Sequence, residues 1–360
     1  MKYYMPVRVY DEKNCVLNHG EEIAALGSKA LIVTGKRSAF LNGSFDDVIR
    51  VMEEHGVEYS VFSDVEENPS TDTVLAAGHK YASQDIDLVV GIGGGSPMDA
   101  AKAIALILKH PEAGPDYLYD KSADPSALPL VCVPTTCGTG SEVTGVSVLT
   151  RHDKKTKISM VHKIFPVMAL IDGKYLKNAS QTLIVNSSVD ALSHLYESML
   201  NAKADDYVRM TAEAGLKAWA MIKDVTGGGR SADETDCGLL MRSATLAGMS
   251  IAQSGTSLPH ALSYTITYDM GLAHGRAVGY FLPGFMEAAS AEERDRLLRL
   301  SGFAGTDDLR SYINRVFGNM SIPEDELTRT FEAVRNNRAK MESASFDVDE
   351  DILKKIVFSW

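Results

Sequence analysis

The chain has 360 residues, of which 45% are hydrophobic, and its 48 acidic side chains exceed its 36 basic ones to give a formal net charge of -12. This length suits one large domain or two ordinary ones. An acidic chain without a cluster of Lys and Arg is a poor partner for nucleic acid or anionic membranes. The polar N-terminus does not resemble a signal peptide, and no apolar stretch reaches about 18 residues. We therefore expect a cytoplasmic protein.

The first half of the chain alternates short apolar runs with amphipathic segments. This rhythm is typical of βαβ units, and it predicts an α/β domain with a parallel sheet. We expect a hairpin at residues 146–160. The predicted strands are 30–35, 58–64, 86–95 and 128–136, and the predicted helices lie near 45–55 and 71–83.

The second half has few strand signals and many Ala-, Leu- and Met-rich segments with helical spacing. We expect an all-helical second domain, with domain boundaries of 1–177 and 178–360. The predicted helices include 187–201, 205–223, 233–254 and 284–299.

A glycine-rich turn follows the strand at 86–95. Gly93, Gly94 and Gly95 lack a Cβ, so backbone amides and a helix N-terminus can approach a phosphate closely. Ser96 is expected as the N-cap and Pro97 as the first helical residue. The turn predicts a pyrophosphate site, although a tight structural turn would have the same composition.

A second polar turn, PTTCGTGSE at 134–142, follows the next apolar strand. Its Thr135, Thr136 and Thr139 can donate hydrogen bonds to phosphate or ribose oxygens. Two such turns at the ends of parallel strands define one ligand crevice. Neither turn matches the GxGxxG fingerprint, so the motifs alone do not identify the ligand.

A candidate metal site lies in the second half. Asp190 and His194 are four residues apart in a helical segment, so they share one face, as a surface pair also would. His260 and His274 add two imidazoles among apolar neighbours. One carboxylate and three imidazoles suit ferrous iron, zinc, manganese or cobalt.

These segments together resemble the iron-containing, or type III, alcohol dehydrogenase family. GGGSPMDAAKAIA, PTTCGTGSEVT, VDALSHLYES, LPHALSY and GLAHGRAVGYFLP occur in the family's order across about residues 20–290. The resemblance implies a dinucleotide-binding α/β domain followed by a helical domain, as in the dehydroquinate synthase-like architecture. It implies a hydride transfer between NAD(P)(H) and an alcohol or carbonyl compound.

The resemblance also implies site residues. The metal ligands, which are also the catalytic residues, would be Asp190, His194, His260 and His274, with Fe²⁺ favoured over Zn²⁺. Gly95, Ser96 and Asp99 would contact the pyrophosphate, Thr135 and Thr136 would flank the nicotinamide, and Asn68, Lys157 and Leu176 would line the cofactor groove. Family members tend to form homodimers or larger homo-oligomers, and we expect the same here, with a small alcohol or aldehyde as substrate.

Three positions depart from the family pattern. Tyr264 stands where the family often has a further histidine, which puts a proton relay through that position in doubt. Cys137 replaces a frequent Ala, and we interpret it as a small buried hydrophobe. The segment VTGKRS, with Gly35 and Lys36, replaces the Asp that binds ribose hydroxyls in NAD-preferring members, which favours NADP(H) over NAD(H) unless this is only a solvated basic turn.

Two other classes of protein stay open at this point. A cyclase like dehydroquinate synthase, which is a lyase, shares the two-domain plan. Zinc-dependent glycerol dehydrogenase also resembles this architecture and is a closer variant of the alcohol dehydrogenase interpretation. A catalytically silent nucleotide-binding protein would also keep the fold. Four chemically competent ligand positions and the SEVT and GLAHG segments favour the alcohol dehydrogenase.

Overall fold

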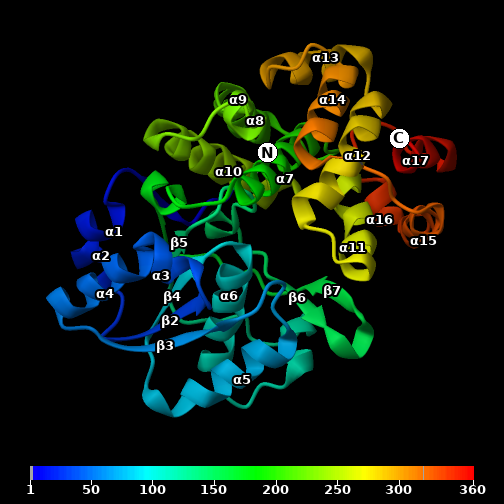
Figure 1. Cartoon of the computed structure of the whole chain (residues 1–360). Helices are drawn as coiled ribbons and strands as arrows, with labels where there is room; N and C mark the ends of the chain where they lie inside the picture. The colour runs from blue at the N-terminus through cyan, green and yellow to red at the C-terminus, as the bar shows by residue number, and fades with distance from the viewer. Residues whose placement is uncertain (1–2, 319) are drawn as a thin grey trace. The chain divides into compact units, whose positions relative to one another are not determined.

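The computed structural model describes residues 3–318 and 320–360 of the chain. The chain forms two compact units (Figure 1). The sheet unit comprises Met5–Thr136 and Gly140–Ala179. The helical unit comprises Ser180–Trp360, together with Cys137–Thr139 and the start of the chain through Tyr4.

Within the described residues, the sheet unit contains a six-stranded parallel sheet with the order β1-β8-β5-β4-β2-β3. Its central strands are rich in Val, Ile and Leu, as expected where both faces of a sheet are covered. The predicted parallel α/β domain is confirmed. The strands are β1 (Arg8–Asp11), β2 (Lys29–Gly35), β3 (Glu58–Val65), β4 (Leu88–Gly93), β5 (Leu130–Pro134) and β8 (Met168–Ile171).

Helices cover both faces of this sheet (Figure 1). Side chains alternate along each strand, so Leu31 and Val33 of β2 pack toward α5 and α6, whereas Ala30 and Ile32 pack toward α1, α2 and α4. The antiparallel hairpin predicted at 146–160 is present as β6 (Val148–Arg151) and β7 (Thr156–Ser159). The helices are α1 (Cys15–Asn18), α2 (Gly20–Ala24), α3 (Ser38–Asn42), α4 (Ser44–His55), α5 (Thr71–Tyr81) and α6 (Gly95–Lys109), and short 3-10 turns are η1 (Ala82–Gln84), η2 (Pro115–Tyr119), η3 (Ser141–Val143), η4 (His152–Lys154) and η5 (Gly173–Leu176).

The helical unit packs around long helices that begin at polar caps. Ser180 and Asp205 accept hydrogen bonds from the first-turn amides of α7 and α8, and Asp233 and Asp236 form a capping box at α10. The helices are α7 (Gln181–Met199), α8 (Asp206–Met221), α9 (Lys223–Thr226), α10 (Glu234–Ser254), α11 (Leu258–Met270), α12 (His274–Ala288), α13 (Ala291–Leu300), α14 (Thr306–Phe317), α15 (Glu324–Arg335), α16 (Arg338–Met341) and α17 (Glu350–Val357).

The single helix predicted at 284–299 is wrong. The chain instead ends α12 at Ala288 and starts α13 at Ala291. Ala289 has extended backbone angles, and the Ser290 side chain caps α13 by accepting from the Glu293 amide. A serine that competes for backbone hydrogen bonds favours such a break over a continuous helix.

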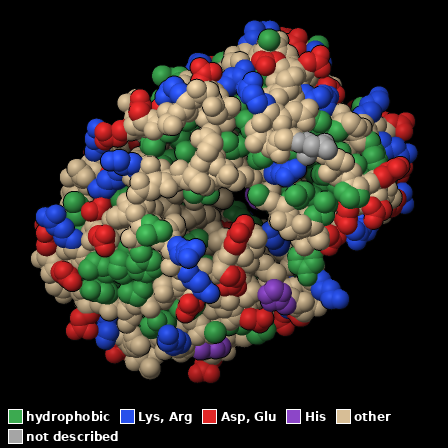
Figure 2. All heavy atoms as spheres, in the orientation of Figure 1, with side chains coloured by type: hydrophobic (Ala, Val, Ile, Leu, Met, Phe, Trp, Pro, Cys, Tyr) green, Lys and Arg blue, Asp and Glu red, His purple; other side chains and the backbone are tan. Residues whose placement is uncertain are grey.

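Acidic and basic side chains are intermixed on the face shown in Figure 2, where no extended area of Lys and Arg appears. Among the helices of the described residues, none is long and apolar enough to cross a membrane.

Candidate functional site

Three helices of the helical unit carry the predicted metal ligands. Asp190 and His194 lie one turn apart on the buried face of α7. His260 lies in the first turn of α11, and His274 is the first residue of α12. Asp190, His194 and His260 are buried, whereas the His274 side chain is 33% exposed.

The three imidazoles converge on one carboxylate oxygen. From Oδ1 of Asp190, the Nε2 atoms of His260, His274 and His194 are 3.2, 3.6 and 3.8 Å away. The rings of His194 and His260 are stacked with centroids 4.3 Å apart. The structure therefore groups Asp190, His260 and His274, whereas His194 approaches Asp190 but lies outside the group whose ligand atoms are all within 4.8 Å of one another.

This arrangement fits a divalent cation. Ligand atoms about 2.1 Å from an ion at tetrahedral angles are roughly 3.4 Å from one another. The distances from Asp190 to the three imidazoles lie around this value, and the ligand atoms of Asp190, His260 and His274 all lie within 4.8 Å of one another. Nitrogen and oxygen donors without a thiolate suit Fe²⁺ as well as Zn²⁺.

The charges at the site favour an ionised carboxylate. Burial alone would favour the neutral acid, but the neighbouring imidazoles outweigh it and lower the pKa of Asp190. Burial lowers the pKa of His194. Burial also opposes protonation of His260, but Glu197 and Asp190 outweigh it and raise its pKa to about 9.

Glu197 is a buried carboxylate at this site that the sequence interpretation missed. Its side chain is fully buried on α7, and Oε1 lies 2.5 Å from Nδ1 of His260. Its pKa is lowered despite burial, because His260 and a hydrogen bond from Ser193 favour the ionised form. Its position three residues after His194, on the same helical face, is the signal that could have identified it.

Two glycines allow close backbone packing around Asp190 and His274. A Cβ at Gly275 would lie 1.9 Å from the backbone oxygen of Asn186 on α7. A Cβ at Gly138 would lie 2.9 Å from the backbone oxygen of Ser187 and 3.1 Å from Oδ2 of Asp190. Because real Cβ atoms do not approach backbone atoms this closely, α12 and the Cys137–Thr139 segment need glycine here.

The first cofactor turn lies in the sheet unit, between β4 and α6. Gly93 has φ +148°, a conformation that favours glycine, and α6 begins at Gly95 with Gly94 as its N-cap. The expected N-cap at Ser96 is therefore wrong. Its hydroxyl instead accepts a hydrogen bond from the Asn68 amide at 3.0 Å, which explains why it does not cap the helix.

The start of the second turn lies beside the first. The Thr135 amide donates to the Gly93 carbonyl at 2.9 Å, and a Cβ at Gly94 would lie 3.0 Å from Cγ2 of Thr136. The Thr135 side chain is buried, and its hydroxyl has no hydrogen-bond partner among the described residues. Thr139 belongs to the helical unit.

Two further residues of the predicted groove, Asn68 and Lys157, are linked to the first turn. Lys157 donates to the Asn68 side chain at 2.8 Å, and burial lowers the pKa of Lys157. Asn68 also contacts Ser96, as described above, and has a left-handed backbone with φ 57°.

The other predicted cofactor residues lie elsewhere in the sheet unit. Leu176 is buried in η5, and Gly35 and Lys36 lie at the carboxyl end of β2.

Asp99, predicted to contact pyrophosphate, bonds to the protein through both oxygens. Oδ1 accepts from the Ser141 hydroxyl at 2.6 Å and Oδ2 from the Val148 amide at 2.9 Å. The buried Lys102 donates to the carbonyls of Ser141 and Val146 at 2.8 and 2.7 Å. This pair on α6 therefore fixes the backbone after the second turn.

Two of the three positions that depart from the family pattern, Tyr264 and Cys137, have defined surroundings in the structure. The Tyr264 ring is nearly parallel to that of His274, with centroids 6.5 Å apart. Cys137 is buried, which raises the pKa of its thiol to about 12, consistent with the expected small hydrophobe. The cysteines in the described part of the chain are all free.

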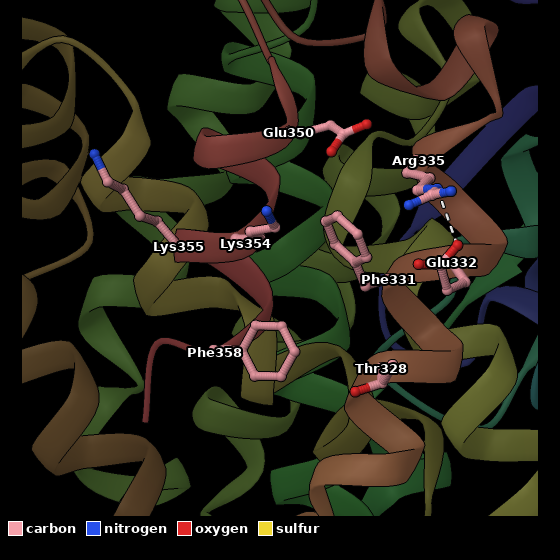
Figure 3. A pocket seen from close by; sticks show the side chains of 8 residues that line it. All are labelled: Thr328, Phe331, Glu332, Arg335, Glu350, Lys354, Lys355 and Phe358. Carbon is pink, nitrogen blue, oxygen red and sulfur yellow. Dashed lines mark ion pairs between the residues drawn. The ribbon is translucent and has the colours of Figure 1, made fainter.

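A separate groove of about 570 Å³ lies between α15 and α17 (Figure 3). It contains none of the predicted metal or cofactor residues, so it is not a candidate for the chemistry. It is lined by Thr328, Phe331, Glu332, Arg335, Glu350, Lys354, Lys355 and Phe358.

Comparisons with protein families match almost the whole chain. Residues 6–173 match the iron-containing alcohol dehydrogenase model, and residues 184–359 match the C-terminal model of the Fe-containing alcohol dehydrogenase family. An iron-containing alcohol dehydrogenase from Thermotoga maritima is 34% identical with a TM-score of 0.91, over 99% of this chain and 98% of that one.

Two named relatives have lower sequence identity to this chain. The NADPH-dependent butanol dehydrogenase of Clostridium saccharobutylicum is 26% identical over 90% of this chain and 85% of its own length. The NAD-dependent methanol dehydrogenase of Bacillus methanolicus is 27% identical over 76% of this chain and 72% of its own length.

The two-domain fold, the clustered carboxylate and imidazoles and these matches define a class of oxidoreductase that uses a metal and a nicotinamide cofactor. The chain belongs to the iron-containing alcohol dehydrogenase family. It is a metal-dependent alcohol dehydrogenase, as the sequence predicted, which argues against the cyclase and the silent binding protein.

Proposed function

We propose that Asp190, His194, His260 and His274 hold the catalytic metal for hydride transfer between a small alcohol and a nicotinamide cofactor. The observation that supports this proposal is the convergence of three imidazole Nε2 atoms within 3.8 Å of one Asp190 oxygen. When bound, a divalent ion acts as a Lewis acid that polarises the alcohol or carbonyl oxygen. The family description favours Fe²⁺, with Zn²⁺ as the alternative.

The protein residues have distinct parts in this proposal. Asp190 supplies one negative charge and leaves a divalent site with net positive charge, since imidazole ligands are neutral. The burial of Asp190, His194 and His260 excludes water from one side of the site. The partly exposed His274 marks the side from which the substrate would enter.

We propose residues 1–177 as the cofactor-binding domain and residues 178–360 as the metal-binding domain. The turn at Gly94, Gly95 and Ser96 would bind the pyrophosphate at the start of α6. The unpartnered hydroxyl of Thr135 supports a hydrogen bond to the cofactor, because a buried hydroxyl without a partner is costly. The other proposed cofactor residues are Gly35, Lys36, Asn68, Asp99, Thr136, Thr139, Lys157 and Leu176.

We propose NADP(H) as the preferred cofactor. Lys36 and Arg37 are exposed at the end of β2, where two cations could bind a 2′-phosphate. The relatives include NADPH-dependent, NAD-dependent and NADH-dependent enzymes, so they do not decide the cofactor preference of this chain. A homodimer or larger homo-oligomer and a cytoplasmic location stay predictions from the sequence.

The metal and the reaction can be tested together. Purified wild-type protein would receive Fe²⁺ or Zn²⁺ under anaerobic conditions, and oxidation of NADPH and NADH would be followed with a panel of short aldehydes. We expect metal-dependent oxidation that His260→Ala abolishes. His79→Ala, which replaces an exposed histidine of the sheet unit, is the matched control and should keep the activity.

Two outcomes would contradict the proposal. Equal activity of wild type and His260→Ala would remove His260 from the ligand set. Bound metal and cofactor without turnover of any aldehyde or alcohol would favour the cyclase or the silent binding protein.

A further inference from the structure

We propose that Glu197 is a positioning residue for the metal centre, which orients the imidazole of His260 and fixes which of its nitrogens faces the ion. This inference rests on the ligand set proposed above. It assigns a function to a buried carboxylate that is not itself a proposed ligand.

Both oxygens of Glu197 are occupied by donors in the interior of the helical unit. Oε1 accepts from the Ser193 hydroxyl at 2.6 Å and pairs with Nδ1 of His260 at 2.5 Å. Oε2 accepts from the Ser257 amide at 2.6 Å. A buried carboxylate with several donors is held in a single orientation, since any rotation would leave a charge unpaired.

This pairing determines which nitrogen of His260 can bind the metal. An imidazole whose Nδ1–H donates to a carboxylate presents the lone pair of Nε2. In the structure, Nε2 of His260 faces Oδ1 of Asp190 at 3.2 Å, the shortest of the three imidazole distances to that oxygen. Glu197 therefore holds His260 in the tautomer and the orientation that a ligand requires.

Glu197 also fixes the start of the helix that carries His260. Ser257 is the N-cap of α11, and its side chain does not cap the helix. The Glu197 carboxylate bonds to the Ser257 amide instead, where a negative charge is favoured by the helix dipole. Glu197 thus fixes both the start of α11 and the orientation of the His260 ring, three residues after Ser257.

The C-terminal region contacts Ser257, the N-cap of α11, through Ser343. The Ser257 hydroxyl lies 2.8 Å from that of Ser343, and the Ala202 amide donates to the Ser343 carbonyl at 2.9 Å. Residues after 320 therefore help to hold Ser257 beside Glu197.

The test compares zinc affinity in wild type, His260→Ala and Glu197→Gln, by competition with a chromophoric chelator. Glu197→Gln keeps the shape of the side chain but removes its charge. Loss of such a supporting carboxylate typically weakens metal binding about 10- to 100-fold, and we expect a loss in this range. The visible absorption of the cobalt(II)-substituted protein should also change, because it reports ligand geometry, and Glu197→Asp should recover part of the affinity.

The matched control is Asp236→Asn. Asp236 is another buried carboxylate of the helical unit, paired with Arg230 and the α10 cap and outside the proposed ligand set. Its substitution should lower the thermal unfolding temperature but leave zinc affinity unchanged. A general loss of stability is thereby separated from a loss of ligand positioning.

The outcomes distinguish the two proposals. Equal zinc affinity of wild type and His260→Ala would overturn the ligand set itself. A large loss in His260→Ala with Glu197→Gln within about twofold of wild type would overturn only the positioning role. If Glu197→Gln does not fold, Ser193→Ala removes one donor to the carboxylate, and an unchanged cobalt spectrum in that variant would overturn the proposal.

Discussion

The helical unit and the sheet unit build their candidate sites in different ways. The helical unit uses buried ionisable side chains, and Asp190, His260 and Glu197 are each within hydrogen-bonding distance of another charged or ionisable group. The sheet unit uses backbone at strand ends, with Gly93 where a Cβ would collide with Pro97 and Gly94 where a Cβ would pack tightly against Thr136. Substitutions at the first site should therefore have the largest effects, whereas the second site should respond less to the loss of a single side-chain contact.

The largest effect is expected for Asp190→Asn. The substitution removes the only carboxylate of the proposed ligand set, so metal retention should fail and kcat/KM should fall about a thousandfold, since a Lewis acid contributes several kcal/mol. Metal content by mass spectrometry and the rate of aldehyde reduction are measured together. Asp205→Asn, at a cap where Asn serves equally well, is the control and should retain both. Full metal content in Asp190→Asn would contradict the prediction.

The next largest effect tests whether the metal site of the helical unit also depends on the close packing of α12 against α7. Gly275→Ala would place a Cβ 1.9 Å from a backbone oxygen of α7, so α12 must shift. We expect a loss of about 3 kcal/mol in the free energy of unfolding, measured with urea, together with weaker metal binding through His274. Gly238→Ala on α10, where nothing lies within 4 Å, should instead stabilise the protein by about 0.5 to 1 kcal/mol. Equal stability of the two variants would show that the close contact is not limiting.

A smaller effect is expected at the exposed end of β2. Replacing both Lys36 and Arg37 by Ala should reduce the preference for NADPH over NADH about tenfold, because two solvent-exposed contacts to a 2′-phosphate are lost. The ratio of kcat/KM for the two cofactors is the measurement. The thermal unfolding temperature should not change. An unaltered ratio would support the solvated basic turn.

The smallest effect is expected for Thr135→Val, which replaces a buried hydroxyl that has no hydrogen-bond partner in the described part of the chain by a methyl group. Stability should be unchanged or slightly higher, while the Kd for the cofactor should rise about fivefold through the loss of one hydrogen bond. Thr330→Val removes a similar hydroxyl on α15, outside both candidate sites, and should leave cofactor binding unchanged. Titration calorimetry that gives the same Kd for wild type and Thr135→Val would remove Thr135 from the cofactor site.

Much of the fold follows from periodicity. Strands such as β2 and β4 are continuous apolar runs, and long helices such as α8 and α10 have clear apolar faces and polar caps. The edge strand β1 and the strand β8 have four residues each, too few to show a period, and they were not predicted. Their pairing joins residues near 10 and 170, which depends on long-range contacts rather than local sequence.

The residues of the candidate site also differ in how far the local sequence could predict them. The spacing of Asp190 and His194 on one helix could be recognised locally, and apolar neighbours marked His260 and His274 as further candidates. The assignment of all four as one ligand set came from the family resemblance. Glu197 was missed because an acidic residue on a helix is usually solvated, and its burial follows from the approach of α11. The expected cap at Ser96 failed for a related reason, since its hydroxyl accepts instead from the distant Asn68.

The division of the chain into units also bears on how such enzymes could be recombined. Cys137–Thr139 belongs to the helical unit although it is flanked on both sides by the sheet unit, so the polypeptide passes from one unit to the other more than once. Gly138 in this segment fits against Ser187 and Asp190. A chimera joined at a single point near residue 180 would therefore take this segment from one parent and its packing partners from the other. Exchange of whole units between relatives requires that the short segment travel with the helices, or that both parents carry glycine there.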